Sequence, residues 1–143
     1  MNAAPSAGVA FEYGLRIFWE DTDAGGIVFY ANYLKFFERA RTEWLRARGH
    51  EQEALRRDAG LMFVVAHTSV NYRAPARLDD WLIVDVRVCE AGRATLTLDQ
   101  QAWRREADGS RTRLADGTIR IGCVDVIRHR PQRIPLELLQ ALS

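Results

Sequence analysis

The stretch EDTDAGGIVFYANYLKFFERA, residues 20–40, places Glu20, Asp21 and Asp23 and two adjacent glycines ahead of a helical pattern. Glycine lets the backbone approach a ligand closely because it carries no Cβ. The first N–H groups of a helix have no partners within the helix and lie at the positive end of its dipole. We therefore expect a carboxylate and a binding site for a developing oxyanion within a few residues of each other.

Thioester hydrolysis suits such a pair of groups. The leaving thiol has a pKa of about 8.5, so the thiolate departs without a strong general acid. A carboxylate that acts as a nucleophile, or as a general base on water, then needs only an oxyanion site beside it. The histidines at positions 50, 67 and 129 are scattered, and the chain has no nucleophile-elbow motif.

Acids beside glycines also have simpler explanations. They commonly serve as turn residues or as partners of a helix dipole, and the residues alone do not decide between these roles and catalysis. A metal site is not expected, because Asp21 and Asp23 have no histidine or cysteine nearby to complete a ligand set.

The elements around this stretch follow from its hydrophobic pattern. A short strand at Leu15–Trp19 should deliver the chain into the loop. From about Tyr30 the apolar residues recur at helical spacing until Gly49, which predicts one long amphipathic helix. Its apolar face consists of Tyr33, Phe36, Phe37, Ala40 and Trp44. Residues 51–57 should add a short helical turn.

The rest of the chain reads mainly as antiparallel strands. Met62–Tyr72 and Trp81–Cys89 are apolar and β-branched, and the alternation resumes after a turn at Gly92. A long strand is expected at Arg111–Val126, although Asp116-Gly117 leaves a turn inside it open. Residues 136–142 suggest a short terminal helix. One long helix followed by hairpins predicts an α+β domain with the sheet wrapped over the helix.

Length and composition predict one cytoplasmic domain. The chain has 143 residues and a net charge of +1, which gives no general case for nucleic-acid binding. We expect a loose tail at residues 1–14, a domain at residues 15–143, no signal peptide and no membrane span. Cys89 and Cys123 lie in apolar runs and are expected to be small buried residues.

Three segments carry a family resemblance: FWEDTDAGGIVFYANYLKFFERARTEWL, FVVAHTSVNYRAPARLDDWL and CVDVIRHRPQRIP. They closely resemble acyl-CoA thioesterases of the hot-dog fold, in particular the YbgC group associated with the Tol-Pal system. The resemblance covers nearly everything from Leu15 to Leu142. It implies an antiparallel sheet wrapped around one long central helix, an acyl-CoA substrate, no cofactor and a homo-oligomer, either a dimer or a tetramer. It also favours an unbroken strand through Asp116-Gly117.

The resemblance assigns the catalytic carboxylate to Asp23 and a structural role to Asp21. YbgC proteins usually have a histidine where this chain has Tyr30. At this point GIVFYANY is more similar to 4-hydroxybenzoyl-CoA thioesterases, in which the backbone N–H of the tyrosine polarises the thioester carbonyl. The neighbouring Gly26, Ile27 and Val28 are then expected to contact the substrate.

The resemblance also implies residues that bind the rest of the ligand. Arg93, Arg128 and Arg130 match basic positions that hold coenzyme A phosphates, for which the arginine fork is well suited. Phe63 matches a pocket position that a neighbouring subunit supplies, and Trp19 is expected beside the catalytic loop. The alternative is a noncatalytic module that binds acyl-CoA or an acyl carrier protein. A dehydratase on the same fold fits less well, because no histidine and acid are placed for proton transfer.

Overall fold

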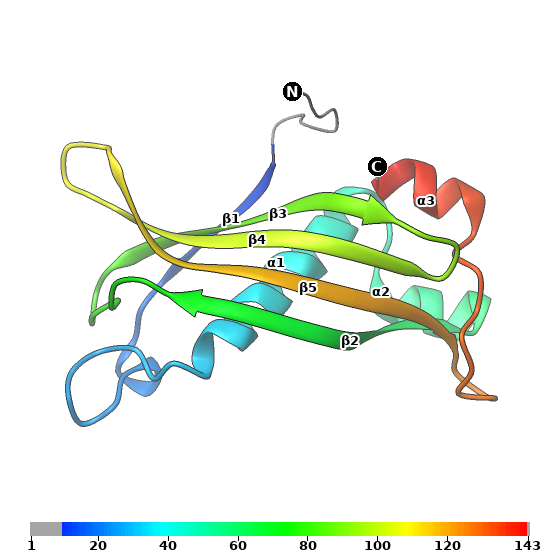
Figure 1. Cartoon of the computed structure of the whole chain (residues 1–143), viewed down its shortest axis with the longest axis horizontal. Helices are drawn as coiled ribbons and strands as arrows, with labels where there is room; N and C mark the ends of the chain where they lie inside the picture. Colours follow the sequence, from blue (N-terminus) through cyan, green and yellow to red (C-terminus); the bar gives the residue numbers. More distant parts are fainter. Residues whose placement is uncertain (1–9, 143) are drawn as a thin grey trace.

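The computed structural model describes residues 10–142 and shows one antiparallel sheet curved around a long helix (Figure 1). The strands lie in the order β1-β3-β4-β5-β2. They are β1 (Phe11–Arg16), β2 (Leu61–Tyr72), β3 (Trp81–Ala91), β4 (Thr95–Arg105) and β5 (Arg111–Asp125). The helices are α1 (Asn32–Ala47), α2 (Gln52–Ala54) and α3 (Leu136–Leu142), with a 3₁₀ turn η2 (Trp19–Asp21) and a π-helical turn η3 (Leu55–Ala59). The expected α+β architecture is confirmed.

The apolar face of α1 forms the centre of the core, as its helical spacing predicts. Its buried residues are Tyr33, Phe36, Phe37, Ala40, Trp44 and Leu45. They are covered by alternate residues of the strands, because successive side chains of a strand point to opposite faces of the sheet. The buried members of this cover include Leu82, Val84, Val86, Leu96, Leu98, Ile119 and Ile121.

Gly117 lies inside β5 at a point where helix and sheet approach closely. The strand pairs with β2 and β4 on either side of this residue without interruption. A Cβ added to Gly117 would lie 3.3 Å from Cε2 of Phe37 and 3.2 Å from Cδ1 of Ile119. The glycine at position 117 therefore serves the close packing of the helix against the strand. The interpretation of this pair as a turn is wrong, and the unbroken strand implied by the resemblance is confirmed.

Gln100 is fully buried, and hydrogen bonds satisfy its side chain. Its Nε2 donates to the carbonyl oxygens of Phe37 and Asp85, each at 3.1 Å. Its Oε1 accepts a hydrogen bond of 2.9 Å from Nη1 of Arg41. Burial lowers the pKa of Arg41, so this acceptor compensates part of the cost of placing a guanidinium between helix and sheet. The amide thereby ties α1 to the middle of the sheet.

Three local expectations differ from the structure. The first strand is Phe11–Arg16 and not Leu15–Trp19, because Phe11, Tyr13 and Leu15 alternate toward the core while Trp19 lies in η2. Part of the predicted loose tail, residues 1–9, lies outside the described residues, but residues 11–14 belong to β1. Cys89 is exposed at a β-bulge between Val88 and Glu90, whereas Cys123 is buried as expected.

Between residues 10 and 142, no helix has the length and apolar character needed to cross a membrane.

We predict that Gln100→Leu lowers the free energy of unfolding by about 2–4 kcal/mol, because two buried carbonyls lose their donor and Arg41 loses its acceptor. Urea unfolding at a fixed protein concentration measures the change. The control is Gln101→Leu, on the opposite face of the same strand, which should change stability by about 0.5 kcal/mol or less. Equal losses in the two variants would contradict the role assigned to Gln100.

Candidate active site

The loop between η2 and α1 is a tight turn that closes on itself (lower left of Figure 1). The N–H of Asp23 donates to the carbonyl of Ile27 at 2.9 Å, and the N–H of Gly26 donates to the carbonyl of Asp23 at 3.0 Å. Gly26 has φ +81°, a left-handed conformation that favours glycine. The N–H of Val28 donates to the carbonyl of Ala76 at 2.9 Å, which anchors the loop to the segment between β2 and β3.

The two aspartates of this loop have different surroundings. Oδ2 of Asp21 accepts a hydrogen bond of 2.8 Å from the N–H of Phe18, and its carbonyl accepts from the N–H of Phe29 and from Nδ2 of Asn32. Asp23 is exposed, and its Oδ1 accepts from the N–H of Gly25 at 2.8 Å. Its Oδ2 accepts no hydrogen bond from residues 10–142. Asp21 therefore fastens the loop to η2 and α1, while Asp23 keeps one oxygen available for a ligand.

A β-turn leads into α1. The N–H of Asn32 donates to the carbonyl of Phe29 at 2.9 Å, which places Tyr30 and Ala31 at the two central positions of the turn. The N–H groups of Tyr30 and Ala31 donate to no acceptor in the part of the chain that the structure describes. Two amide donors are therefore free at the positive end of α1.

A pocket opens beside these free amides. It has a volume of about 270 Å³ and is lined by Ile27, Val28, Tyr30, Tyr33, Tyr72, Arg73, Ala74 and Pro75. The ring of Tyr72 makes edge contacts with the rings of Tyr30 and Tyr33, with centroid distances of 5.9 and 5.5 Å. Burial raises the pKa of Tyr33, which a backbone hydrogen bond with Ala76 partly offsets. The pocket is thus largely aromatic and apolar.

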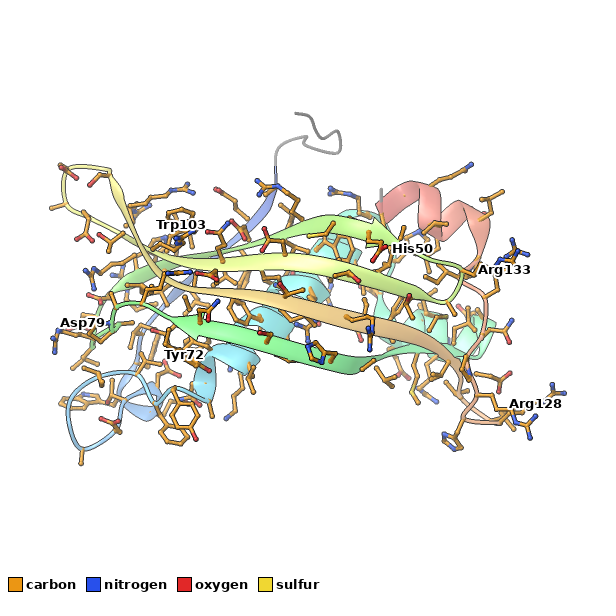
Figure 2. The ribbon with its side chains drawn as sticks, viewed as in Figure 1. His50, Tyr72, Asp79, Trp103, Arg128 and Arg133 are labelled. Carbon is orange, nitrogen blue, oxygen red and sulfur yellow. The ribbon has the colours of Figure 1, made fainter. Side chains whose placement is uncertain are left out.

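The structure brings together only part of the predicted site. Asp23, Gly26, Ile27, Val28 and Tyr30 lie in one loop, and Trp19 lies in η2 next to it with most of its side chain exposed. The other predicted binding residues are at the opposite end of the sheet, where Figure 2 shows Arg128 far from Tyr72. They are Phe63 at the start of β2, Arg93 in the turn between β3 and β4, and Arg128 and Arg130 after β5.

The length of β2 indicates how far apart these groups are. Phe63 and Tyr72 lie on the same strand, and a strand rises about 3.3 Å per residue, so their Cα atoms are separated by about 30 Å. A single chain therefore does not bring Phe63 or the three arginines to the loop of Asp23.

Tyr33 and Tyr72 were not predicted as site residues. Tyr33 was assigned to the core, where it is indeed buried, but it also lines the pocket. Tyr72 is 42 positions from Tyr30 in the sequence, and no spacing pattern connects them. Among residues 10–142, no group of three or more His, Cys, Asp or Glu side chains is placed to hold a metal ion.

The chain is similar to known thioesterases over most of its length. The sequence model of the Thioesterase superfamily matches residues 25–109. The acyl-CoA thioesterase YbgC of Haemophilus influenzae is 39% identical over 92% of this chain and 93% of its own length. A probable thioesterase from Bartonella henselae is 30% identical, with a TM-score of 0.80 over 89% of this chain and all of the other. The 4-hydroxybenzoyl-CoA thioesterase of Pseudomonas sp. strain CBS-3 shares the fold, with a TM-score of 0.85 at 18% identity, over 92% of this chain and 98% of the other.

A sheet wrapped around one long helix, shared with these structures, defines a hot-dog-fold domain. The chain belongs to the Thioesterase superfamily. Membership confirms the expectation of a thioester hydrolase.

Proposed function

We propose that this protein hydrolyses acyl-CoA thioesters to a free acid and coenzyme A. The observation that carries the proposal is the loop before α1, where, among residues 10–142, Asp23 has a carboxylate oxygen without a partner and Tyr30, which lines the pocket, has a free N–H. The similarity to proteins named acyl-CoA thioesterases supports the choice of substrate class. The predicted cytoplasmic location stays a prediction.

In this proposal the thioester carbonyl oxygen accepts a hydrogen bond from the N–H of Tyr30. The positive end of α1 stabilises the negative charge that develops on this oxygen. The Asp23 carboxylate either removes a proton from the attacking water, which gives the free acid directly, or attacks the carbonyl carbon itself. In the second case the thiolate of coenzyme A leaves a mixed anhydride on Asp23, and water then hydrolyses this anhydride to the free acid and the carboxylate. Gly26 leaves the approach to the carbonyl open, because no Cβ stands at this position. Ile27 and Val28 contribute to the wall that contacts the acyl group.

A thiol-release assay over short, long and aromatic acyl-CoAs tests the proposal. We expect hydrolysis of at least one class well above the background rate. The competing function is a noncatalytic module that binds acyl-CoA or an acyl carrier protein. Binding of acyl-CoA without turnover anywhere on the panel would favour that function.

We predict that Asp23→Asn lowers turnover by several orders of magnitude, because it keeps the size of the side chain and removes the reactive carboxylate. Asp21→Asn should affect turnover much less. Single-turnover kinetics measure both, and circular dichroism checks that the variants remain folded. A greater loss in Asp21→Asn than in Asp23→Asn would reverse our assignment of the two acids.

The role of the Tyr30 amide is tested with proline. Tyr30 occupies the first central position of the turn Phe29–Asn32, which commonly accommodates proline, and its N–H makes no hydrogen bond within the described chain. Tyr30→Pro should lower kcat roughly 100- to 1000-fold through the loss of one oxyanion donor. Tyr30→Phe keeps the N–H and should retain most of the rate. Near-normal turnover by a folded Tyr30→Pro protein would show that this amide is not the oxyanion donor. An inactive Tyr30→Phe protein would instead assign the catalytic contribution to the tyrosine hydroxyl.

We further propose that two copies of the chain build each complete site. β2 is an edge strand of the sheet, and Val64 and Val65 are 38% and 51% exposed along it. An unpaired edge of this length favours antiparallel pairing with a second copy. About a twofold axis near the middle of β2, Phe63, Arg93, Arg128 and Arg130 of one copy would approach the Asp23 loop of the other. A tetramer would add a second pair of chains.

Complementation between inactive variants tests this arrangement. Asp23→Asn in one copy and Arg128→Ala with Arg130→Ala in the other should each reduce kcat/KM strongly when present in both copies. A mixed dimer, purified with two affinity tags, retains one intact site and should regain about half of the wild-type rate. No recovery in a verified mixed dimer, or an active monomer by light scattering, would contradict the proposal.

A further inference from the structure

Tyr72 stands where the proposed acyl pocket meets the end of β2. It is the last residue of that strand and pairs with Ala115 of β5. Its side chain is 46% exposed, yet its ring contacts the rings of Tyr30 and Tyr33. Partial burial raises the pKa of Tyr72, and the nearby Tyr30 hydroxyl adds to this effect. The ring therefore leans over the pocket and forms its rim.

The backbone that carries this ring is held in place. The N–H groups of Arg73 and Ala74 both donate to the carbonyl of Leu114, at 2.8 and 3.2 Å. The guanidinium of Arg73 also pairs with the carboxylate of Asp116 on β5. Since a tyrosine has only two side-chain torsions, a fixed backbone and two ring contacts leave Tyr72 little freedom to move away.

The three tyrosines that line the pocket differ in their other structural and proposed functional roles. Tyr33 is 3% exposed and belongs to the core under the sheet. Tyr30 carries the free amide to which the oxyanion is assigned. Of the three tyrosines, only Tyr72 lies outside both the core cluster and the loop that carries Asp23 and Tyr30. Its size can therefore affect which acyl groups enter while the reacting atoms remain in place.

We propose that Tyr72 determines acyl-group specificity by forming the rim of the pocket. This inference rests on the proposed function. A pocket of about 270 Å³ lies just below the range of about 300–1,000 Å³ typical of sites for drug-sized ligands, so it suits a compact acyl group. A longer acyl chain that extends past this rim would meet the ring of Tyr72, so the size of the ring should affect how well the chain binds.

The test compares kcat/KM for butyryl-CoA and dodecanoyl-CoA in the oligomer as it is purified. Tyr72→Ala should raise the ratio of dodecanoyl to butyryl hydrolysis by about tenfold or more, within the discrimination that added methylenes produce in apolar pockets. Tyr72→Phe keeps the ring and should leave the ratio within about twofold of the wild type. Tyr72→Trp enlarges the ring and should lower the ratio.

Two controls separate this inference from other effects. Ser110→Ala changes an exposed residue in the hairpin between β4 and β5, which belongs neither to the pocket nor to the segments of the predicted arginines, and it should not alter the ratio. Light scattering checks that each variant keeps the oligomeric state of the wild type. If Tyr72→Ala does not fold, the comparison of Tyr72→Phe with Tyr72→Trp still tests the effect of ring size.

The outcomes distinguish the inference from the function on which it rests. Unchanged ratios in active Tyr72→Ala or Tyr72→Trp proteins would overturn the role of Tyr72 and leave the thioesterase proposal intact. If the wild type hydrolyses neither substrate nor any other acyl-CoA, the proposed function fails. The pocket is then tested by calorimetry with the thioethers butyl-CoA and dodecyl-CoA, which cannot be hydrolysed. If Tyr72→Ala raises the ratio of dodecyl-CoA to butyl-CoA affinity, the role of Tyr72 is supported. If this ratio does not change, that role is overturned.

Discussion

The close contact between α1 and the sheet is the constraint on which the rest of the structure depends. The ring of Phe37 lies against β5 at a position where only a residue without a Cβ fits easily, and Gly117 supplies it. Packing at this density fixes the rotation and position of the helix. The start of α1 is therefore held at one end of the sheet, beside the end of β2. For this reason Tyr30, whose amide has no acceptor among residues 10–142, lies at the pocket.

Hydrogen bonding separates two neighbouring acids into different roles. Asp21 uses both its side chain and its carbonyl to hold η2, the loop and Asn32 together. These hydrogen bonds of Asp21 stabilise the loop. Oδ2 of Asp23 takes no part in them. A rigid loop is what a reactive group requires, because a small displacement of a nucleophile or base costs much of the rate. The hydrogen bonds of Asp21 thus hold the loop in which we propose that Asp23 reacts.

The sheet also separates the groups that a complete acyl-CoA site needs. The reactive loop and the tyrosine pocket lie at one end, and the arginines suited to phosphate lie at the other. An antiparallel edge strand offers a simple solution, since pairing with a second copy reverses the direction of the sheet and brings opposite ends together. The exposed valines of β2 are apolar surface that the proposed pairing would cover.

Much of this protein can be predicted from local patterns. The helical spacing from Tyr33 to Trp44 and the alternation in the strands follow from short-range rules, and they predict the α+β fold that the structure confirms. The DTDAGG loop before the helix is where the same rules place the proposed reactive groups. Only the tertiary structure decided that Gly117 continues a strand, that Cys89 is exposed and that Tyr72 lies against Tyr30. It also decided that Phe63 and the arginines lie far from Asp23. The reason is physical: periodicity and turn chemistry act over a few residues, whereas these contacts and distances depend on how a helix and five strands pack together.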